Sequence, residues 1–306
     1  MFPYFLLHTD TPCRLLEEGL ELDSQALQCR INESVPTTVV YAIWSDAKRH
    51  PKDNFKRFFK IRERLRQALS NIILPRNFSC ILSIEGASLL EEHIERIALL
   101  SSLGVRTLTP LWYGEDSIGG AWNTDVGLTE FGERAIKEAI RHRMLPDISH
   151  ACWRSAEQIA DVCEHFGVPV FASHSNSYSV CKHRRNLTDR LFQRIVSTHG
   201  LLGLCFAPEH LTLSGDATLT DLLLHTEHLL SLGGENVLAL GSDFDGIGQT
   251  PAGLSSTDDL PRLCEAYSKI GYPDPLIRKL LYQNAQSFFA DFFSDFEYHF
   301  FENKII

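Results

Sequence analysis

The feature that most constrains this chain is the regular alternation of short β-rich runs with longer stretches of helical hydrophobic spacing. Such pairs are typical of βα units built around a parallel sheet. Eight of them follow one another within about 240 residues, which is the size of a (β/α)8 barrel. We therefore predict an α/β fold: a single TIM-like (β/α)8 barrel with a C-terminal helical tail, forming one domain over residues 1–306 with its core at about 4–290.

The predicted elements cover most of the sequence. The strands are expected near residues 3–7, 37–43, 78–84, 106–111, 144–148, 169–173, 201–206 and 237–241. The helices include 54–74, 89–103, 130–143, 154–166, 188–197 and 218–232, with tail helices at 260–270 and 275–289. Residues 291–306 are aromatic and acidic by turns, and we expect them to cover either the barrel floor or a neighbouring subunit.

An open doubly wound sheet is the alternative fold for this pattern. It usually carries a Gly-rich phosphate-binding loop after its first strand. Here the first predicted strand runs into His8-Thr9-Asp10 instead. The barrel is therefore preferred.

Composition excludes several classes of partner. Lys and Arg number 29 against 39 Asp and Glu, and the resulting net charge of −10 argues against nucleic acid. No apolar run reaches the roughly 18 residues that span a bilayer, and no basic residue precedes the short apolar stretch after Met1. The eight cysteines form neither a cluster nor a CxxC pair. We expect a cytoplasmic protein without a membrane partner.

Residues of metal-ligand type occur at the ends of five predicted strands. Barrel active sites lie where the carboxyl ends of the strands meet, so these side chains are expected at one mouth. Imidazole and carboxylate groups form the ligand set of hydrolytic zinc sites and related divalent-ion sites. Taken singly, each could be a core histidine or a turn-capping carboxylate, but five coincidences are improbable. The residues are His8, Asp10, Glu85, His150, His174 and Asp243.

Several motifs in this order resemble the membrane (renal) dipeptidase family, the zinc peptidases of family M19 within the amidohydrolase-like barrels, over about residues 4–290. The matching segments are His8-Thr9-Asp10-Thr11-Pro12, Ser83-Ile84-Glu85-Gly86, Asp147-Ile148-Ser149-His150, Ala172-Ser173-His174-Ser175-Asn176, Arg184-Arg185-Asn186 and Gly241-Ser242-Asp243-Phe244-Asp245-Gly246. The resemblance implies two divalent metal ions, with Zn²⁺ the expected metal. It assigns His8 and Asp10 to one ion, assigns His150 and His174 to the other, and makes Glu85 the bridge.

The same resemblance implies a dipeptidase mechanism in which a metal-bridging hydroxide attacks the carbonyl of a dipeptide. Glu85 and Asp243 are then the catalytic carboxylates, and Asp243 takes the proton and returns it to the leaving amine. Asp245 shares the same face and is the alternative for that role. Asp243 is preferred because it lies nearer the strand end.

Substrate binding is assigned to Arg185 and Trp112. The resemblance gives Arg185 the substrate's C-terminal carboxylate, a contact that suits a forked guanidinium; the alternative is a solvated loop charge. Trp112 stands where mammalian members have a histidine, and Ala207 stands where they have a substrate-contacting tyrosine. These departures leave the substrate preference open. They also leave open whether a D-residue is accepted at the C-terminal position of the dipeptide, as it often is in the family.

Two further functions stay open from the sequence. One is an amidohydrolase-like hydrolase acting on another amide or a lactone, and the other is a metal-binding barrel without turnover. The partner expected from the resemblance is a small dipeptide, and relatives are often dimers, so a homodimer is also an open possibility.

Other residues with potential chemistry are given no metal or nucleophile role. His225 and His228 have HxxH spacing, which does not place both imidazoles on one helical face. Cys152 and Cys181 lie near the expected mouth but have no evident activating base. Asp147 is expected to orient a ligand histidine instead of binding metal.

Overall fold

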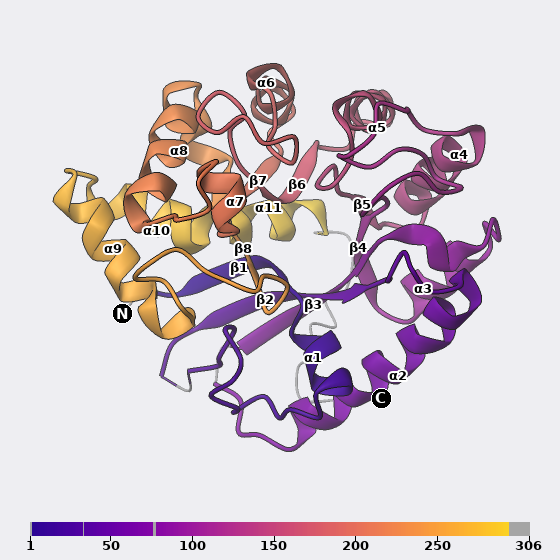
Figure 1. Ribbon diagram of the computed structural model, residues 1–306, viewed down its shortest axis with the longest axis horizontal. Helices are drawn as coiled ribbons and strands as arrows, with labels where there is room; N and C mark the ends of the chain where they lie inside the picture. Colours follow the sequence, from indigo (N-terminus) through magenta and orange to yellow (C-terminus); the bar gives the residue numbers. More distant parts are fainter. Residues whose placement is uncertain (1, 33, 76–77, 294–306) are drawn as a thin grey trace.

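Eight parallel strands form one sheet in the computed structural model, which describes residues 2–32, 34–75 and 78–293 (Figure 1). Their order is β5-β4-β3-β2-β1-β8-β7-β6. A parallel bridge between Asp147 and Phe171, with a 2.9 Å bond from Ile148 N to Phe171 O, links the two end strands. This confirms the (β/α)8 barrel and is incompatible with a doubly wound sheet. The strands are Tyr4–Thr9, Thr37–Trp44, Phe78–Glu85, Val105–Thr109, Leu145–Pro146, Phe171–Ser175, Leu201–Cys205 and Leu238–Phe244 for β1 to β8.

Helices surround the sheet in Figure 1, and several begin at side-chain caps. Thr129 accepts a hydrogen bond from Gly132 N before α4, and Thr188 accepts one from Leu191 N before α6. Thr218 and Asp221 form a capping box at α8. The helices are α1 Thr11–Glu17, α2 Pro51–Ser70, α3 Arg96–Ser102, α4 Glu130–Arg141, α5 Trp153–His165, α6 Asp189–Ser197, α7 Pro208–Leu211, α8 Leu219–Ser231, α9 Leu260–Lys269, α10 Asp274–Arg278 and α11 Asn284–Phe292.

The predicted helix at 89–103 is wrong in its first half. A 3₁₀ turn covers Ala87–Leu90, the backbone then turns left-handed at Glu91 and Glu92, and α3 begins only at Arg96. Arg96 closes this turn: it donates 2.6 Å to Leu89 O and pairs with Glu91 at 2.6 Å. Contacts that the Arg96 side chain makes with the preceding residues thus override the helical spacing of this segment.

Two other predicted elements differ from the structure. Strand β5 has two residues, because Pro146 offers no backbone donor to extend the ladder. The predicted tail helix at 275–289 is α10, then a π-helical turn at Lys279–Gln283, then α11. The π turn shifts the register of the helix. The apolar spacing of the sequence does not reveal this shift.

The N-terminal end of the barrel is closed by α11. An apolar cluster joins Phe288 and Phe289 of this helix to the first residues of several strands, and Phe5 stacks on Phe289 at 5.2 Å between ring centroids. Phe293 belongs to this cluster, so the expectation that the tail covers the floor holds up to residue 293, and 294–306 lie outside the described residues.

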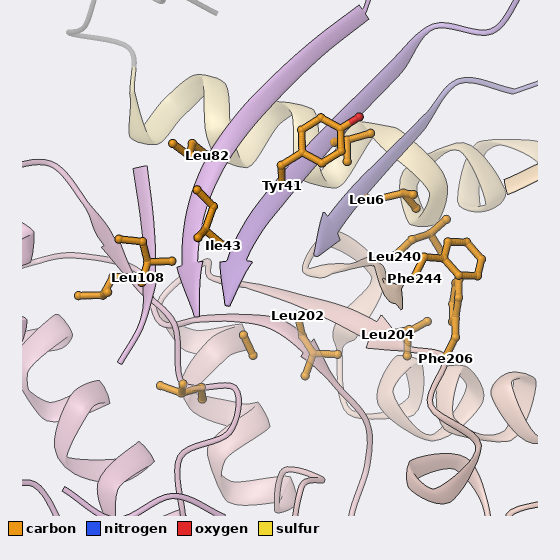
Figure 2. Packing of buried hydrophobic residues seen from close by; sticks show 14 of the residues in the cluster. Leu6, Tyr41, Ile43, Leu82, Leu108, Leu202, Leu204, Phe206, Leu240 and Phe244 are labelled. Carbon is orange, nitrogen blue, oxygen red and sulfur yellow. The ribbon is translucent and has the colours of Figure 1, made fainter. Parts of the chain in front are cut away.

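The larger apolar cluster packs the sheet against its helices (Figure 2). Six neighbouring strands contribute the buried side chains Leu6, Tyr41, Leu82, Leu108, Leu202 and Leu240. None of the eight cysteines is in a disulfide. Within the described ranges, no helix combines the length and the apolarity that crossing a membrane requires.

Candidate metal centre and active site

The carboxyl ends of β1, β3, β6 and β8 and the segment after β5 bring the six predicted ligand-type residues together. Groups of three have their ligand atoms within 4.8 Å of one another. Glu85 and His174 are buried, as are His8 in β1 and Asp10 just after it. His150 and Asp243 are partly exposed. The groups are His8, Asp10 and Glu85; Glu85, His150 and His174; and His8, His174 and Asp243.

Glu85 is the centre of this cluster. Its Oε1 atom lies 2.9 Å from His150 Nε2, 3.5 Å from His174 Nε2 and 3.6 Å from His8 Nε2. His8 Nε2 is also 3.4 Å from Asp10 Oδ2. One carboxylate is therefore shared between a His8–Asp10 pair and a His150–His174 pair.

Both histidines of the second pair are held with Nε2 facing the cluster. His150 Nδ1 donates to Trp112 O at 3.1 Å. Ser173 Oγ donates to Asp147 Oδ2 at 2.5 Å and lies 2.7 Å from His174 Nδ1. The Ser173 oxygen therefore accepts from His174 Nδ1–H, which leaves an unprotonated Nε2 on each ring.

Asp147 is an anchor for this part of the site. It accepts hydrogen bonds from Thr109 Oγ1 at 2.6 Å, Ser149 N at 2.9 Å and Ser173 N at 3.0 Å. It belongs to none of the metal-type groups found in the described chain. Its position, acting through Ser173 on His174, matches the orienting role expected of it.

The cluster fits metal ions on its own chemistry. Both ring nitrogens of His8 and Asp10 Oδ1 are buried without a hydrogen-bond partner among the described residues. Burial lowers the pKa of His150 and of His174 well below the ordinary value, so both imidazoles are neutral, the form that can bind a metal ion. Burial also lowers the pKa of His8, but the carboxylates of Glu85 and Asp10 outweigh it and raise that pKa to about 10. The site thus attracts positive charge, which a divalent cation supplies.

Backbone geometry aims these side chains at one point. The register of β1 against β8 shifts between His8 and Thr9, and His150 adopts a left-handed φ of 66°. Ser242 and Asp243 are also left-handed, at 62° and 67°. Such conformations are uncommon outside glycine and cluster at functional sites.

Gly246 is required by close approach to the carboxylates. A Cβ at this position would lie 2.2 Å from Asp10 Oδ2 and 2.7 Å from Asp243 Oδ1. Any other residue would therefore push two of the acidic side chains out of place.

The cluster opens into a cavity of about 820 Å³. Arg185 lines it, and its buried side chain donates to His174 O at 3.3 Å while its Nε has no partner in the described part of the chain. Burial lowers the pKa of Arg185. Trp112 lines the cavity with its side chain, and Ala207 is fully buried at the start of α7.

Asp243 and Asp245 have different surroundings. Asp243 Oδ2 accepts from the Cys205 thiol at 3.6 Å, and burial raises the pKa of Asp243 to about 7. Both oxygens of Asp245 are occupied, because it accepts from Thr11 Oγ1 at 2.6 Å and from Gln28 N at 2.8 Å. Asp245 therefore anchors the segment around Gln28 and is less suited to proton transfer.

The remaining histidines and cysteines of interest lie in structural contacts. His225 accepts from Ser177 N at 3.0 Å and contacts Leu211 O at 3.1 Å, while His228 pairs with Asp189 at 2.9 Å. Cys152 caps α5. The Cys181 thiol contacts Glu209 O at 3.8 Å.

Sequence reasoning missed Trp44, Trp122, Cys205 and His210, all near the site. Trp44 and Cys205 end strands β2 and β7, so the strand-end rule could have identified them. Trp122 and His210 lie outside the strands and carry no spacing signal.

A barrel whose strand ends gather histidines and carboxylates is a setting for metal-dependent hydrolysis. Residues 7–291 match the family model described as membrane dipeptidase, peptidase family M19. The chain belongs to this family and is a metal-dependent dipeptidase.

Three known proteins resemble this chain in sequence or in fold. An uncharacterised protein from the pqqA 5′ region of Klebsiella pneumoniae is 32% identical over 216 residues, covering 67% of this chain and 78% of that protein. The crystal structure of dipeptidase AC, a family M19 metallopeptidase, has a TM-score of 0.81 at 25% identity and covers 94% of this chain and 98% of its own. A metallopeptidase from Rhodobacter sphaeroides, liganded with a phosphinate mimic of the dipeptide L-Ala-D-Ala, shares the fold. Its TM-score is 0.79 at 24% identity, and the match covers 94% of this chain and 98% of that chain.

Proposed function

We propose that this dipeptidase holds two divalent metal ions, with Zn²⁺ the expected metal, in two ligand sets that share Glu85. The observation that carries the proposal is the position of Glu85 Oε1 within 3.6 Å of the Nε2 atoms of three histidines. Two neighbouring cations need an anionic bridge, and Glu85 is the carboxylate common to both sets. One set is completed by His8 and Asp10, and the other by His150 and His174.

Bound divalent ions would supply a water acidified enough to attack at neutral pH and would polarise the substrate carbonyl. Asp243 accepts the proton from the attacking water and passes it to the leaving amine. In the chain alone, burial raises the pKa of Asp243 to about 7. Nearby cations favour its charged form, which is the form that accepts a proton. The Cys205 thiol and the left-handed backbone hold this carboxylate over the cluster.

Arg185 binds the C-terminal carboxylate of the dipeptide. Its guanidinium is buried beside the cluster, lines the cavity and has a free Nε donor within the described structure. A buried guanidinium without a carboxylate partner is costly, so an anionic group of the substrate would complete its hydrogen bonding. Trp112 contributes to substrate binding through its side chain in the cavity wall.

The substrate class is a dipeptide whose C-terminal residue can have either the L or the D configuration. The fold shared with the Rhodobacter sphaeroides enzyme, which binds a mimic of L-Ala-D-Ala, supports this proposal. The test is hydrolysis of L-Ala-L-Ala, L-Ala-D-Ala, D-Ala-L-Ala and D-Ala-D-Ala, with and without chelator. We expect turnover of the first two, lost with chelator and restored by Zn²⁺. No hydrolysis of any member with added Zn²⁺ would reject the proposal.

A further inference from the structure

We infer that the cavity selects dipeptides whose N-terminal residue carries a large uncharged side chain, with aromatic residues preferred. The inference rests on the proposed function, because it takes Arg185 as the group that binds the substrate carboxylate. It adds a specificity wall built around Trp44, a residue without an assigned role so far.

The barrel order places Arg185 and Trp44 on opposite sides of the mouth. Trp44 ends β2, and Arg185 lies in the segment after β6. In the order β5-β4-β3-β2-β1-β8-β7-β6, these two strands are four apart in either direction around the barrel. The ligand cluster lies between them, since its members come from β1, β3, β5, β6 and β8. A dipeptide anchored at Arg185, with its peptide bond at the cluster, therefore extends its N-terminal residue toward Trp44.

An aromatic wall begins on that side with Trp44 and runs along the cavity to Trp122, whose ring centroid lies 5.3 Å from that of His183, near Arg185. Trp44 meets Trp112 edge to face with 4.9 Å between ring centroids. Trp112 lies 5.8 Å from Tyr113, and Tyr113 lies 6.1 Å from Trp122. All four residues line the cavity, and they include three of the four tryptophans in the chain. Aromatic faces and edges favour contact with another ring over contact with a small aliphatic group.

The two ends of the wall, Trp44 and Trp122, are anchored. Trp44 N donates to the Cys13 thiol at 3.4 Å, and the Arg57 guanidinium lies 5.6 Å from the Trp44 ring centroid. Trp122 N donates to His150 O at 2.7 Å, which ties the far end of the wall to a member of the ligand cluster. Side chains on an anchored backbone lose less entropy on binding than those on a free one, which helps these contacts discriminate between substrates.

The size of the cavity agrees with this selection. Its volume of about 820 Å³ lies in the range of sites for drug-sized ligands. Two alanine residues would leave most of that space to water. A large apolar side chain on the N-terminal residue of the substrate would displace this water by packing against the wall. If this contact persists in the transition state, its binding energy lowers the barrier to hydrolysis.

The test compares kcat/KM for X-L-Ala dipeptides with X = L-Ala, L-Leu and L-Phe in the metal-loaded enzyme. We expect Phe-Ala to exceed Ala-Ala by roughly 10-fold or more, with Leu-Ala between them. Trp44→Leu should reduce the Phe-Ala to Ala-Ala ratio by roughly 3- to 10-fold. Tyr113→Leu changes an exposed member of the wall, threatens folding less, and should reduce the ratio in the same direction.

Phe59→Leu is the matched control, since this half-exposed ring lies on α2 outside the cavity, and the ratio should stay at its wild-type value. Equal rates for Phe-Ala and Ala-Ala, or an unchanged ratio in both wall variants, would overturn the inference and leave the proposed dipeptidase site standing. Absence of hydrolysis for every dipeptide would overturn both.

Discussion

The Nε2 atoms of His150 and His174 lie 2.9 Å apart beside the Glu85 carboxylate. Each ring uses its Nδ1–H elsewhere, on Trp112 O and on Ser173 Oγ, so both Nε2 atoms carry lone pairs. Two lone pairs at this distance repel each other unless a cation lies between or beside them. This pair of histidines is therefore the strongest structural sign of a metal ion at the barrel mouth.

Metal binding should stabilise the fold. A ligand that binds only the folded state adds about 2.7 kcal/mol at 100 times its dissociation constant. For a domain of this size, that should raise Tm by about 5 °C between chelator-treated and Zn²⁺-loaded protein. Differential scanning calorimetry with both samples gives the comparison. Identical melting temperatures would show that Zn²⁺ does not bind the folded chain at this site.

Asp243→Asn should abolish most turnover while retaining metal. The amide cannot accept the proton, and loss of a general acid–base group costs about 10²- to 10⁴-fold in kcat. Asp245→Asn is the control, because Asp245 anchors the segment at Gln28 and its loss should cost about 1–3 kcal/mol of stability with kcat of the folded protein largely kept. Full activity in Asp243→Asn combined with inactive, folded Asp245→Asn would assign proton transfer to the other carboxylate.

Arg185→Ala should raise KM for dipeptides by roughly 10- to 100-fold with a smaller effect on kcat, since it removes a charge-assisted contact to the carboxylate. The adjacent Arg184 is exposed and pairs with Asp125, so Arg184→Ala is a matched control. Steady-state kinetics on both variants separates the two arginines. An unchanged KM in Arg185→Ala would reject its role in carboxylate binding.

Acidification should destabilise the protein in part through His225. Burial lowers the pKa of His225 from the ordinary 6.5 to about 4, so the unfolded chain binds this proton more readily than the folded one. The contribution of neutral His225 to the free energy of unfolding is complete above about pH 6.5 and is lost as the pH falls toward 4. The loss is roughly 3 kcal/mol, because each unit of pKa difference is worth about 1.4 kcal/mol.

Urea unfolding at about pH 7.5 and pH 5 measures this loss. His225→Asn should lose less stability than wild type over that interval, although it starts less stable because it disturbs the bond from Ser177 N. An equal loss in both proteins would place the acid sensitivity elsewhere.

The sequence predicted the barrel because each βα unit repeats a local hydrophobic period that neighbouring units reinforce. It also brought His8, Asp10, Glu85, His150, His174 and Asp243 to one mouth, since the carboxyl ends of parallel strands must meet there. It preferred Asp243 to Asp245 only by position along the strand, because the hydrogen bonds from Thr11 and Gln28 that occupy Asp245 come from residues more than 200 positions away.

The parts that sequence reasoning missed depend on long-range contacts. Arg96 breaks the helix predicted at 89–103 through its bond to Leu89 and its position 4.0 Å from the Phe55 ring centroid, which no local pattern reveals. The aromatic wall joins Trp44 to Trp112, Tyr113 and Trp122, which are far from it in sequence and come together only once strands β2, β3 and β4 have paired.

Metal content of the active enzyme tests the shared role of Glu85 most directly. Elemental analysis of purified, Zn²⁺-loaded protein, with dipeptide hydrolysis measured on the same sample, should give two ions per chain and chelator-sensitive turnover. Glu85→Ala should retain one ion or fewer and lose turnover. Two ions per chain with wild-type turnover in Glu85→Ala, or full wild-type activity with one ion per chain, would contradict the two-ion site.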